Sequence, residues 1–415
     1  MSTPSLIGPT QRVLVAGGGP AGLLAALALA QAGVETVLVT PEPPLAGRGP
    51  EARTAALFTS SLALLQRAGV WDECRAASAP LAAIRIVDDR GGWLRAPEVV
   101  FAAAELGQTE FGYNVPNAVL ATALRRALRQ CKHLTWIEGQ TVTSVQPFDD
   151  RIDVQLSDCA TMTASLVAGA DGRTSVCRTG AGISVRATAY DQVAVTAAFA
   201  HQRPHAGIST ELHGPAGPCT TVPLPGRSSS LVWVERPAIA ARLLAMDDHA
   251  FVAALETRLQ GLLGALSAPT PRGRFPLTWM QAERVAARRV MLVGEAAHVM
   301  PPIGAQGLNL GLRDVGWLIE CVTDAVAEGR DIGGAEVVAR YNAARASDIG
   351  LRMSAVDALN RSLLTELVPV HLARGLGLHA IAASRSLRQR LMANGLAPMG
   401  ALPRAMRTLP VPAGP

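Results

Sequence analysis

The pattern of apolar positions near the N-terminus predicts a strand–helix–strand unit. Residues 12–16 and 34–39 are short, continuous apolar runs, which are typical of parallel strands buried on both faces. Between them, residues 20–32 are rich in alanine and leucine, which favour a helix. A run of glycines joins the first strand to this helix, and that order of elements is typical of a mononucleotide-binding unit.

Further along the chain, helical and strand-like patterns alternate. Helices are predicted at residues 54–68 and 118–130, and strands at residues 81–88, 137–145 and 152–156.

In the second half of the chain, the pattern predicts first a strand-rich stretch and then a mainly helical one. Residues 190–280 hold several strand-like runs separated by proline and glycine, which predicts a β-rich insert that could serve as a substrate platform. A buried strand at residues 290–293 and a helix at residues 308–328 follow. The remainder is predicted to be mainly helical, with breaks at Pro369 and Gly395.

Composition narrows the class of protein. A chain of 415 residues with 49% hydrophobic and 17% charged residues is expected to fold into two or three domains. The net charge of +5 comes from arginine, since Lys132 is the only lysine, and aromatic residues make up only 4%. This modest charge with few aromatics argues against a nucleic-acid partner.

The cysteines and the N-terminus point to a cytoplasmic protein. The cysteines are scattered singly, without the spacing of a metal site or a disulfide framework, so no metal is expected. No signal peptide or transmembrane span is predicted, because the most apolar run, residues 23–39, is interrupted by Gln31, Gly33 and Glu35.

The first motif with chemical meaning is the glycine-rich turn at residues 17–22. Small residues there let the backbone approach a pyrophosphate, whose charge the following helix N-terminus stabilises. The second strand usually ends in a carboxylate that binds ribose, but this chain has Thr40, with Glu42 two residues later. The cofactor-binding residues expected here are Gly17, Gly19, Pro20, Ala21, Gly22 and Thr40.

A second glycine-rich motif spans residues 294–310, and a cofactor bound at both places must be long, as FAD is. Glu295 can bond ribityl hydroxyls, and the free amides that begin a helix near Gly307 can stabilise the negative charge of a reduced flavin. His298 is expected to be a hydrogen-bonded loop histidine rather than an acid or base. The cofactor-binding residues expected here are Gly294, Glu295, Gly307, Leu308 and Asn309.

Residues 294–314 resemble the flavin-ring motif of class A flavoprotein monooxygenases, the para-hydroxybenzoate hydroxylase type. The resemblance implies that Pro302 offers its carbonyl beside the oxygenation site, and that Leu308 and Asn309 present their amides to the flavin. These three are the candidate catalytic residues. The usual aspartate of the family is Glu295 here, one methylene longer.

Two shorter stretches resemble other motifs of the same family. The resemblance places Asp171, within residues 170–178, near the cofactor and the path of the pyridine nucleotide; the alternative is an ordinary Asp-Gly turn. It places Arg53, within residues 51–57, at the FAD pyrophosphate; the alternative is a solvated loop charge.

A narrower resemblance, to the flavin hydroxylases of ubiquinone biosynthesis, covers nearly the whole chain. The departures are Thr40, Glu295 and the order of Gly304 and Ala305, which those enzymes often reverse. The fragments that carry it, by their order and spacing, are residues 53–57, Tyr190, and residues 192–195, 275–277 and 307–314.

The resemblance implies an α/β fold, in which a Rossmann-like FAD-binding domain carries an inserted β-sheet substrate domain and a helical C-terminal region. This is the para-hydroxybenzoate hydroxylase fold. The expected parts are residues 1–80, 104–182 and 281–340 for the FAD-binding domain, 81–103 and 183–280 for the substrate domain, and 341–415 for the C-terminal region.

The resemblance also implies the activity: NAD(P)H reduces the flavin, and one oxygen atom of O2 passes to a phenolic ring, in this case a prenylated intermediate of ubiquinone biosynthesis. The sequence singles out no base for the phenol among the insert histidines, which are His201, His205, His213 and His249.

Several alternatives stay open at this point. The substrate could be another phenolic metabolite, or the chain could be a flavin dehydrogenase or a FAD fold without hydroxylase activity, which Thr40 and Glu295 would suit. A halogenase would need an active-site lysine, and Lys132 lies at a helix end.

The partners beyond the substrate are also open, and they include a homo-oligomer or a ubiquinone-biosynthesis complex. The C-terminal arginines either dock on anionic lipid at the inner face of the membrane or belong to solvated helix faces packed on the core. They are Arg374, Arg385, Arg388, Arg390, Arg404 and Arg407.

Overall fold

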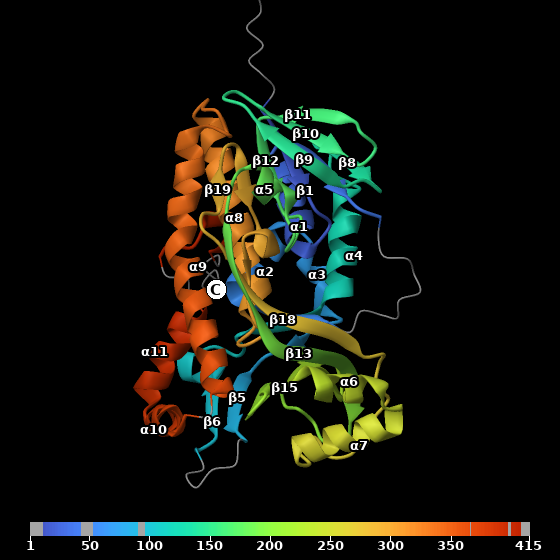
Figure 1. The fold of residues 1–415 in the computed structure, drawn as a ribbon, viewed down its shortest axis with the longest axis vertical. Coiled ribbons are helices and arrows are strands. Elements are labelled where there is room, and N and C mark those ends of the chain that lie inside the picture. Colours follow the sequence, from blue (N-terminus) through green and yellow to red (C-terminus); the bar gives the residue numbers. More distant parts are fainter. Residues whose placement is uncertain (1–10, 43–52, 90–95, 366, 397–399, 408–415) are drawn as a thin grey trace, which may run out of the picture.

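The computed structural model describes residues 11–42, 53–89, 96–365, 367–396 and 400–407. A nucleotide-binding type of sheet lies at one end of the molecule and a large, mostly antiparallel sheet at the other, with the C-terminal helices along one side (Figure 1). The α/β architecture expected from the sequence is confirmed.

The first sheet has six strands, and its centre is the predicted strand at the N-terminus. This strand, β1, pairs in parallel with β2 on one side and with β12 on the other. All but its first residue are buried, as expected for a strand covered on both faces. In sheet order the strands are β19 (Ala286–Ala287), β20 (Val290–Leu292), β12 (Leu166–Gly169), β1 (Arg12–Ala16), β2 (Glu35–Thr40) and β8 (Leu134–Glu138).

Helices from distant parts of the chain cover this sheet. Helix α1 (Pro20–Gln31) packs between α8 (Gln306–Ala327) and α4 (Asn117–Leu128). The predicted helices at 20–32, 118–130 and 308–328 are thereby confirmed within a few residues. A small antiparallel sheet and a short helix complete this end: β9 (Val142–Pro147), β10 (Ile152–Leu156), β11 (Thr161–Ala164) and α5 (Val176–Gly180).

The large sheet forms the other half of the molecule. Its pairings are antiparallel except between β14 and β5, and helices α6 (Pro237–Ala245) and α7 (Asp248–Leu259) bury a separate apolar core against one of its faces. In sheet order the strands are β21 (His298–Val299), β18 (Gly273–Ala282), β13 (Val185–His201), β16 (Ser228–Glu235), β15 (Gly217–Leu224), β14 (Ile208–Gly214), β5 (Ala83–Asp88) and β6 (Val99–Ala102), with β17 (Leu266–Ser267) beside β13.

A three-stranded sheet, β3 (Thr54–Phe58), β7 (Gly112–Pro116) and β4 (Ala79–Pro80), lies between the two halves. The predicted helix at residues 54–68 is wrong over its first five residues, which pair with β7. Helix α2 begins only at Thr59, because the partner strand comes from a distant segment that local sequence does not reveal. The short helices nearby are α2 (Thr59–Arg67), α3 (Trp71–Arg75) and η1 (Ala103–Leu106).

Two further predictions need correction. The predicted strand at residues 137–145 is two strands, β8 and β9, separated at Gly139, where φ is +84°. The insert is rich in strands as predicted, but α6 and α7 were not predicted.

The C-terminal region is helical, as expected. Helix α9 (Ala335–Leu364) ends just before the predicted break at Pro369, and helix α10 (Val368–Ala383) carries that proline in its first turn. Helix α11 (Arg385–Leu396) follows, and the chain then returns toward α8 with η3 (Arg404–Met406). No helix among the described residues is both long and apolar enough to cross a bilayer.

Candidate functional site

A cavity of about 1060 Å³ lies where the two halves meet. Its walls come from the glycine-rich turns of the first sheet, the three-stranded sheet, the large sheet and the start of α8. The predicted site residues that line it are Gly17, Gly19, Pro20, Ala21, Gly22, Arg53, Asp171, Gly294, Glu295, Pro302, Gly307 and Leu308. Thr40 and Asn309 do not line it.

The first glycine-rich turn shows why small residues are needed there. Gly17 has φ of +127°, and a Cβ on it would clash with the carbonyl oxygen of Ala170. A Cβ on Gly22 would clash with the carbonyl oxygen of Gly17. At Gly19, the N-cap of α1, a Cβ would meet nothing within 4 Å. The first two glycines therefore serve packing, whereas Gly19 leaves open space at a helix N-terminus, which suits a phosphate group.

The end of β2 departs from the expectation. The side chain of Thr40 is fully buried, and its hydroxyl accepts a hydrogen bond from Nε1 of Trp136 at 3.0 Å. Glu42, two residues later, lines the cavity instead. The hydroxyl of Thr40 is thus bonded to Trp136, and the carboxylate near this end of β2 that lines the cavity is that of Glu42.

Asp171 lines the cavity and carries one buried oxygen without a hydrogen-bond partner. Its Oδ2 accepts from the backbone amide of Cys177 at 3.0 Å, while its Oδ1 is buried without a hydrogen-bond partner. A buried polar atom that lacks a partner is costly, and it indicates a ligand or an ordered water. The Asp-Gly turn therefore forms, and its aspartate lines the cavity while its Oδ1 is shielded beside Gly169.

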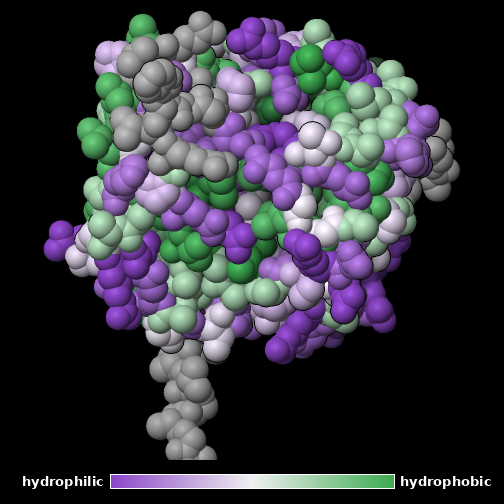
Figure 2. All heavy atoms as spheres, turned by 90° about the horizontal axis from the view of Figure 1, so that it is seen from below, coloured by the Kyte–Doolittle hydropathy of each residue, from purple (hydrophilic) through white to green (hydrophobic). Residues whose placement is uncertain are grey.

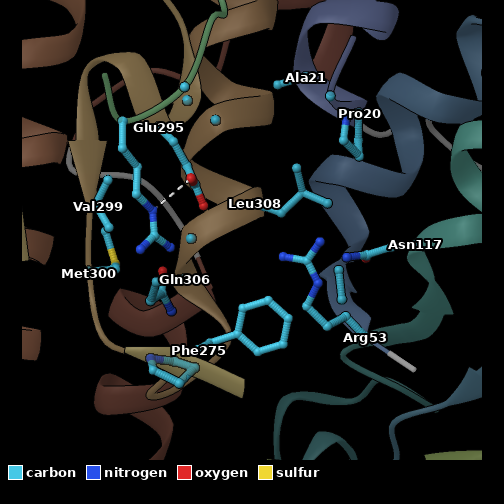
Figure 3. A pocket seen from close by; sticks show the side chains of 18 of the residues that line it. Pro20, Ala21, Arg53, Asn117, Phe275, Glu295, Val299, Met300, Gln306 and Leu308 are labelled. Atoms are coloured by element: carbon cyan, nitrogen blue, oxygen red, sulfur yellow. Dashed lines mark hydrogen bonds and ion pairs between the residues drawn. The ribbon is translucent and has the colours of Figure 1, made fainter. Parts of the chain in front are cut away.

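Glu295 lies after β20, in the short helix η2 (Gly294–Ala296), and its Oε2 accepts from Nε of Arg173 at 3.0 Å. Arg53 extends from the opposite wall, with its guanidinium 4.6 Å from the centre of the Phe275 ring. Figure 3 shows Leu308 in the middle of the cavity, between Arg53 and Glu295.

The N-terminus of α8 opens onto the cavity through two residues with left-handed backbone, Gly304 (φ +63°) and Ala305 (φ +55°). A helix leaves amides unpaired only in its first turn. Because α8 begins at Gln306, the amides of Gly307 and Leu308 are free, whereas Asn309 is the first residue whose amide the helix can pair.

The side chain of Asn309 has a structural task. It is fully buried; its Oδ1 accepts from the amide of Phe58 at 3.0 Å, and its Nδ2 donates to the carbonyls of Ala56 and Ala305, both at 2.7 Å. Asn309 therefore joins β3 to the first turn of α8, and its contribution to the cavity is one of positioning.

A buried charge network lies behind the start of α8, and it was not predicted from the sequence. His298 contacts Oδ2 of Asp314 at 2.7 Å, in agreement with its expected role as a hydrogen-bonded histidine. Burial alone would raise the pKa of Asp314, but His298 and Arg345 outweigh it and hold that pKa below its usual range. Arg345 also donates to Asp348 at 2.8 Å.

Asp348 is the centre of this network, since it accepts from Arg313, Arg345 and Arg352. Burial raises its pKa, but the guanidinium groups outweigh burial and lower that pKa to about 2. Arg352 continues to Oε1 of Gln306 at 2.6 Å, so the network supports the start of α8 from behind. The signal available in the sequence was an Arg–Asp–Arg stripe at positions 345, 348 and 352, one face of a helix.

The wall formed by the large sheet also holds residues that were not singled out. Glu211 and Thr220 line the cavity, and both are 7% exposed. His213 lies next to Glu211, with Nε2 3.2 Å from Oε2 of that carboxylate. Alternation along a strand places Glu211 and His213 on one face, but only the fold shows that this face meets the cavity.

The chain matches known proteins over most of its length. The model of the family described as FAD binding domain matches residues 10–347. The ubiquinone hydroxylase UbiL of Rhodospirillum rubrum is 37% identical over 407 residues, covering 96% of this chain and 93% of that protein. The 3-demethoxyubiquinol 3-hydroxylase of Escherichia coli is 32% identical, covering 92% of this chain and 97% of that protein.

Solved structures share the fold at lower identity. The p-nitrophenol 4-monooxygenase PnpA from Pseudomonas putida superposes with a TM-score of 0.74 at 20% identity, covering 94% of this chain and all of that one. PqsL from Pseudomonas aeruginosa, in complex with 2-aminobenzoylacetate, has a TM-score of 0.72 at 19% identity, covering 89% and 99%. The expected para-hydroxybenzoate hydroxylase type of fold is confirmed. The chain belongs to the FAD binding domain family and, within it, to the ubiquinone hydroxylases, which makes it a flavoprotein monooxygenase.

Proposed function

We propose that this chain uses FAD, NAD(P)H and O2 to hydroxylate the ring of a prenylated phenol in ubiquinone biosynthesis. The names of the relatives from Rhodospirillum rubrum and Escherichia coli describe hydroxylation of ubiquinone or its precursors. The observation that carries the proposal is the first turn of α8, whose free amides open onto a cavity closed on its other side by the large sheet.

The cavity fits FAD by three observations. Open space at Gly19 and the helix N-terminus behind it suit the pyrophosphate, with Arg53 as its counter-ion. Asp171 lines the same cavity, and Glu295 offers a carboxylate to the ribityl hydroxyls. When bound, FAD supplies the activation of O2 and the transfer of one oxygen atom.

The protein side chains would then position the ring and keep water away. The free amides of Gly307 and Leu308 favour negative charge on the flavin ring beside them. Pro302 lines the same part of the cavity, and the facing wall includes Val222 and Leu277. A largely apolar wall limits the access of water to the reacting atoms.

The proposal includes contact with a membrane surface. Exposed apolar side chains of α10 support it. This helix contains Leu372 and Leu376, which are 45% and 71% exposed. Three of the C-terminal arginines, Arg374, Arg388 and Arg404, form ion pairs with carboxylates of the chain, so they offer less charge to lipid. On the face at the large-sheet end, hydrophobic and hydrophilic residues are interspersed (Figure 2). Co-sedimentation with anionic vesicles, and its loss in Leu372→Ser/Leu376→Ser, would test this contact.

The test of the function uses purified protein and 2-geranylphenol as a probe. We expect yellow protein that contains FAD, NADH or NADPH oxidation stimulated by the phenol, and a product that carries one oxygen atom from isotopically labelled O2. A strain that lacks the gene should accumulate an under-hydroxylated prenylphenol. Colourless protein that takes up no FAD, or a deletion strain with normal quinones, would refute the proposal.

A further inference from the structure

A row of four side chains crosses the cavity-facing wall of the large sheet. Thr196 lies opposite Val232, Val232 opposite Thr220, and Thr220 opposite Glu211. Residues directly opposite each other on paired strands point to the same face, and all four line the cavity. Glu211 and Thr220 are therefore direct neighbours on the large-sheet wall of the cavity.

Glu211 is a buried carboxylate that the chain itself satisfies only in part. Its Oε2 is held by Nε2 of His213 at 3.2 Å. Its Oε1 has no donor among the described residues, although the residue is only 7% exposed. Removing a carboxylate from water is costly unless it is paired and fully hydrogen-bonded. This arrangement leaves one carboxylate oxygen for a donor that enters the cavity.

Two further polar atoms at the cavity lack partners. Oγ1 of Thr220 and Oδ1 of Asn114 are both buried without a hydrogen bond, and their residues are 7% and 0% exposed. Thr220 belongs to the large sheet, and Asn114 belongs to the three-stranded sheet but packs directly on the large one, since its Nδ2 donates to the carbonyl of Pro223 at 2.8 Å. The seryl groups nearby are paired, since Ser230 bonds Thr54 at 2.9 Å and Ser209 bonds the carbonyl of Thr221 at 3.3 Å. Both unpaired oxygens are shielded from the ligand-free cavity, and the carboxylate of Glu211 remains as the acceptor with unused capacity.

We propose that Glu211 binds and deprotonates the ring hydroxyl of an uncharged phenol. This inference rests on the proposed function and assigns the base that the sequence left open. The phenolic O–H bond breaks, its proton moves to a carboxylate oxygen of Glu211, and the electron pair stays on the phenolate. The phenolate makes the ring carbons ortho and para to it more electron-rich, which favours attack on the oxygen that is transferred.

The proton is returned once the ring has gained its oxygen atom. The attacked carbon loses its hydrogen as a proton to solvent, and the proton held by Glu211 goes back to the ring oxygen. Glu211 therefore ends the cycle as a carboxylate. His213 keeps the carboxylate in place throughout.

A carboxylate in this position also selects the substrate by charge. A phenol that still carries a ring carboxyl group would bring a second negative charge into a buried site, which is unfavourable. We therefore expect a neutral prenylphenol to bind better than the same ring with a carboxyl group. The substrate supplied to this enzyme must then have no ring carboxyl group, so any such group must be removed in an earlier reaction.

The first test compares Glu211→Gln with Glu235→Gln in the FAD-loaded protein. Glu235 lies on β16 of the same sheet, does not line the cavity and accepts from Nε1 of Trp233, so it is a matched control. For 2-geranylphenol, Glu211→Gln should lower kcat about 100-fold or more while KM changes less than about 10-fold. Residual activity in Glu211→Gln should rise with ring-fluorinated, more acidic phenols. Glu235→Gln should behave as the native protein.

The second test measures binding alone. The dissociation constants of 2-geranylphenol and of a carboxylated 2-geranylphenol are compared by perturbation of the flavin spectrum. The native protein should prefer the neutral ring by about 10-fold or more, and Glu211→Gln should reduce that preference. Thr220→Val is a control on the same wall: its hydroxyl is shielded from the cavity and has no partner to lose, so it should change neither the fold nor the binding of either phenol.

The outcomes separate this inference from the proposed function. A native protein that hydroxylates the phenol, with Glu211→Gln equally active and equally selective, would overturn the inference and leave the function standing. A native protein that neither binds nor hydroxylates any phenol would overturn both. If Glu211→Gln does not fold, Glu211→Asp decides, and unchanged kcat with unchanged selectivity in that variant would overturn the inference.

Discussion

Arg173 donates from Nε to Oε2 of Glu295 at 3.0 Å, and so joins two cavity-lining turns that lie 122 residues apart. The turns are brought together because β12 and β20, the strands that precede them, pair in parallel. About half of each side chain is exposed, 45% for Arg173 and 56% for Glu295. An ion pair so exposed contributes little to stability, so Glu295 can exchange this partner for a ligand hydroxyl at little cost.

Glu295→Ala should therefore impair FAD binding more than folding. Loss of a charged hydrogen bond to the ribityl chain should weaken FAD binding roughly 10- to 100-fold, while the free energy of unfolding of the FAD-free protein changes by less than about 1 kcal/mol. Fluorescence titration with FAD and urea unfolding measure the two. Glu283→Ala, an exposed carboxylate outside the cavity, is the control. Equal FAD affinity in both variants would remove Glu295 from the cofactor site.

Gly19→Ala tests the open space at the N-cap of α1. An added methyl group meets no protein atom within 4 Å, so FAD-free protein should keep its stability within about 0.5 kcal/mol. The methyl group would crowd a bound pyrophosphate, which should weaken FAD binding roughly 10-fold or more. Gly350→Ala, at a similarly open position within α9, should leave FAD binding unchanged and raise stability slightly. Unaltered FAD affinity in Gly19→Ala would place the phosphates elsewhere.

Asn309→Ala tests the link between β3 and α8. It would leave the amide of Phe58 and the carbonyl of Ala56 without this partner, so stability should fall by about 2–3 kcal/mol. Freed from β3, the first turn of α8 should also bind FAD more weakly.

Asn342→Ala is the matched control, because the Asn342 side chain bonds backbone groups of Val285 and Ala286 away from the cavity. It should lower stability by a similar amount with unchanged FAD affinity at a temperature where both variants are folded. If the two variants bind FAD equally, Asn309 serves stability alone.

Local motifs could be predicted from the sequence because their structure depends on neighbouring residues. The turn at residues 17–22 and the start of α8 are set by glycine, proline and the following helix, and the structure has them where expected. Thr40 shows the limit, since its hydroxyl faces Trp136, which is 96 residues away. Whether the side chain at the end of a strand points toward a ligand depends on partners that are remote in the sequence.

The substrate wall could not be predicted for the same reason. The pattern around Glu211 and His213 indicates a strand, but the place of Glu211 on the cavity that the start of α8 also lines depends on how two halves of the molecule pack. The helices α6 and α7 were missed because strand-like runs surround them, and helix α7 has little amphipathic pattern to separate it from those runs.

Acid should destabilise the protein through the buried charge network around Asp348, which supports the start of α8. The arginines around Asp348 outweigh the effect of burial and lower its pKa to about 2, below an unfolded value of about 3.9. A depressed folded pKa contributes stability that is present above the unfolded pKa and is lost as the pH falls through the folded one. Asp348 should thus contribute about 2–3 kcal/mol near neutral pH, lost between roughly pH 4 and pH 2.

Urea unfolding over that pH range measures the loss. Asp348→Asn should lower stability near neutral pH and decline less steeply below about pH 4. Asp150→Asn, an exposed carboxylate, should behave as the native protein. The same acid slope in Asp348→Asn would show that other groups govern acid unfolding.

The separation in the chain of the two turns that line the cavity has a consequence for synthesis. Gly17 and Gly294 lie on the same cavity, but translation of α8 comes some three hundred residues after that of β1. A polypeptide released early by the ribosome carries the phosphate turn but lacks the helix that would neighbour the reactive ring. The cavity therefore has both of its glycine-rich turns only after synthesis has passed Gly294.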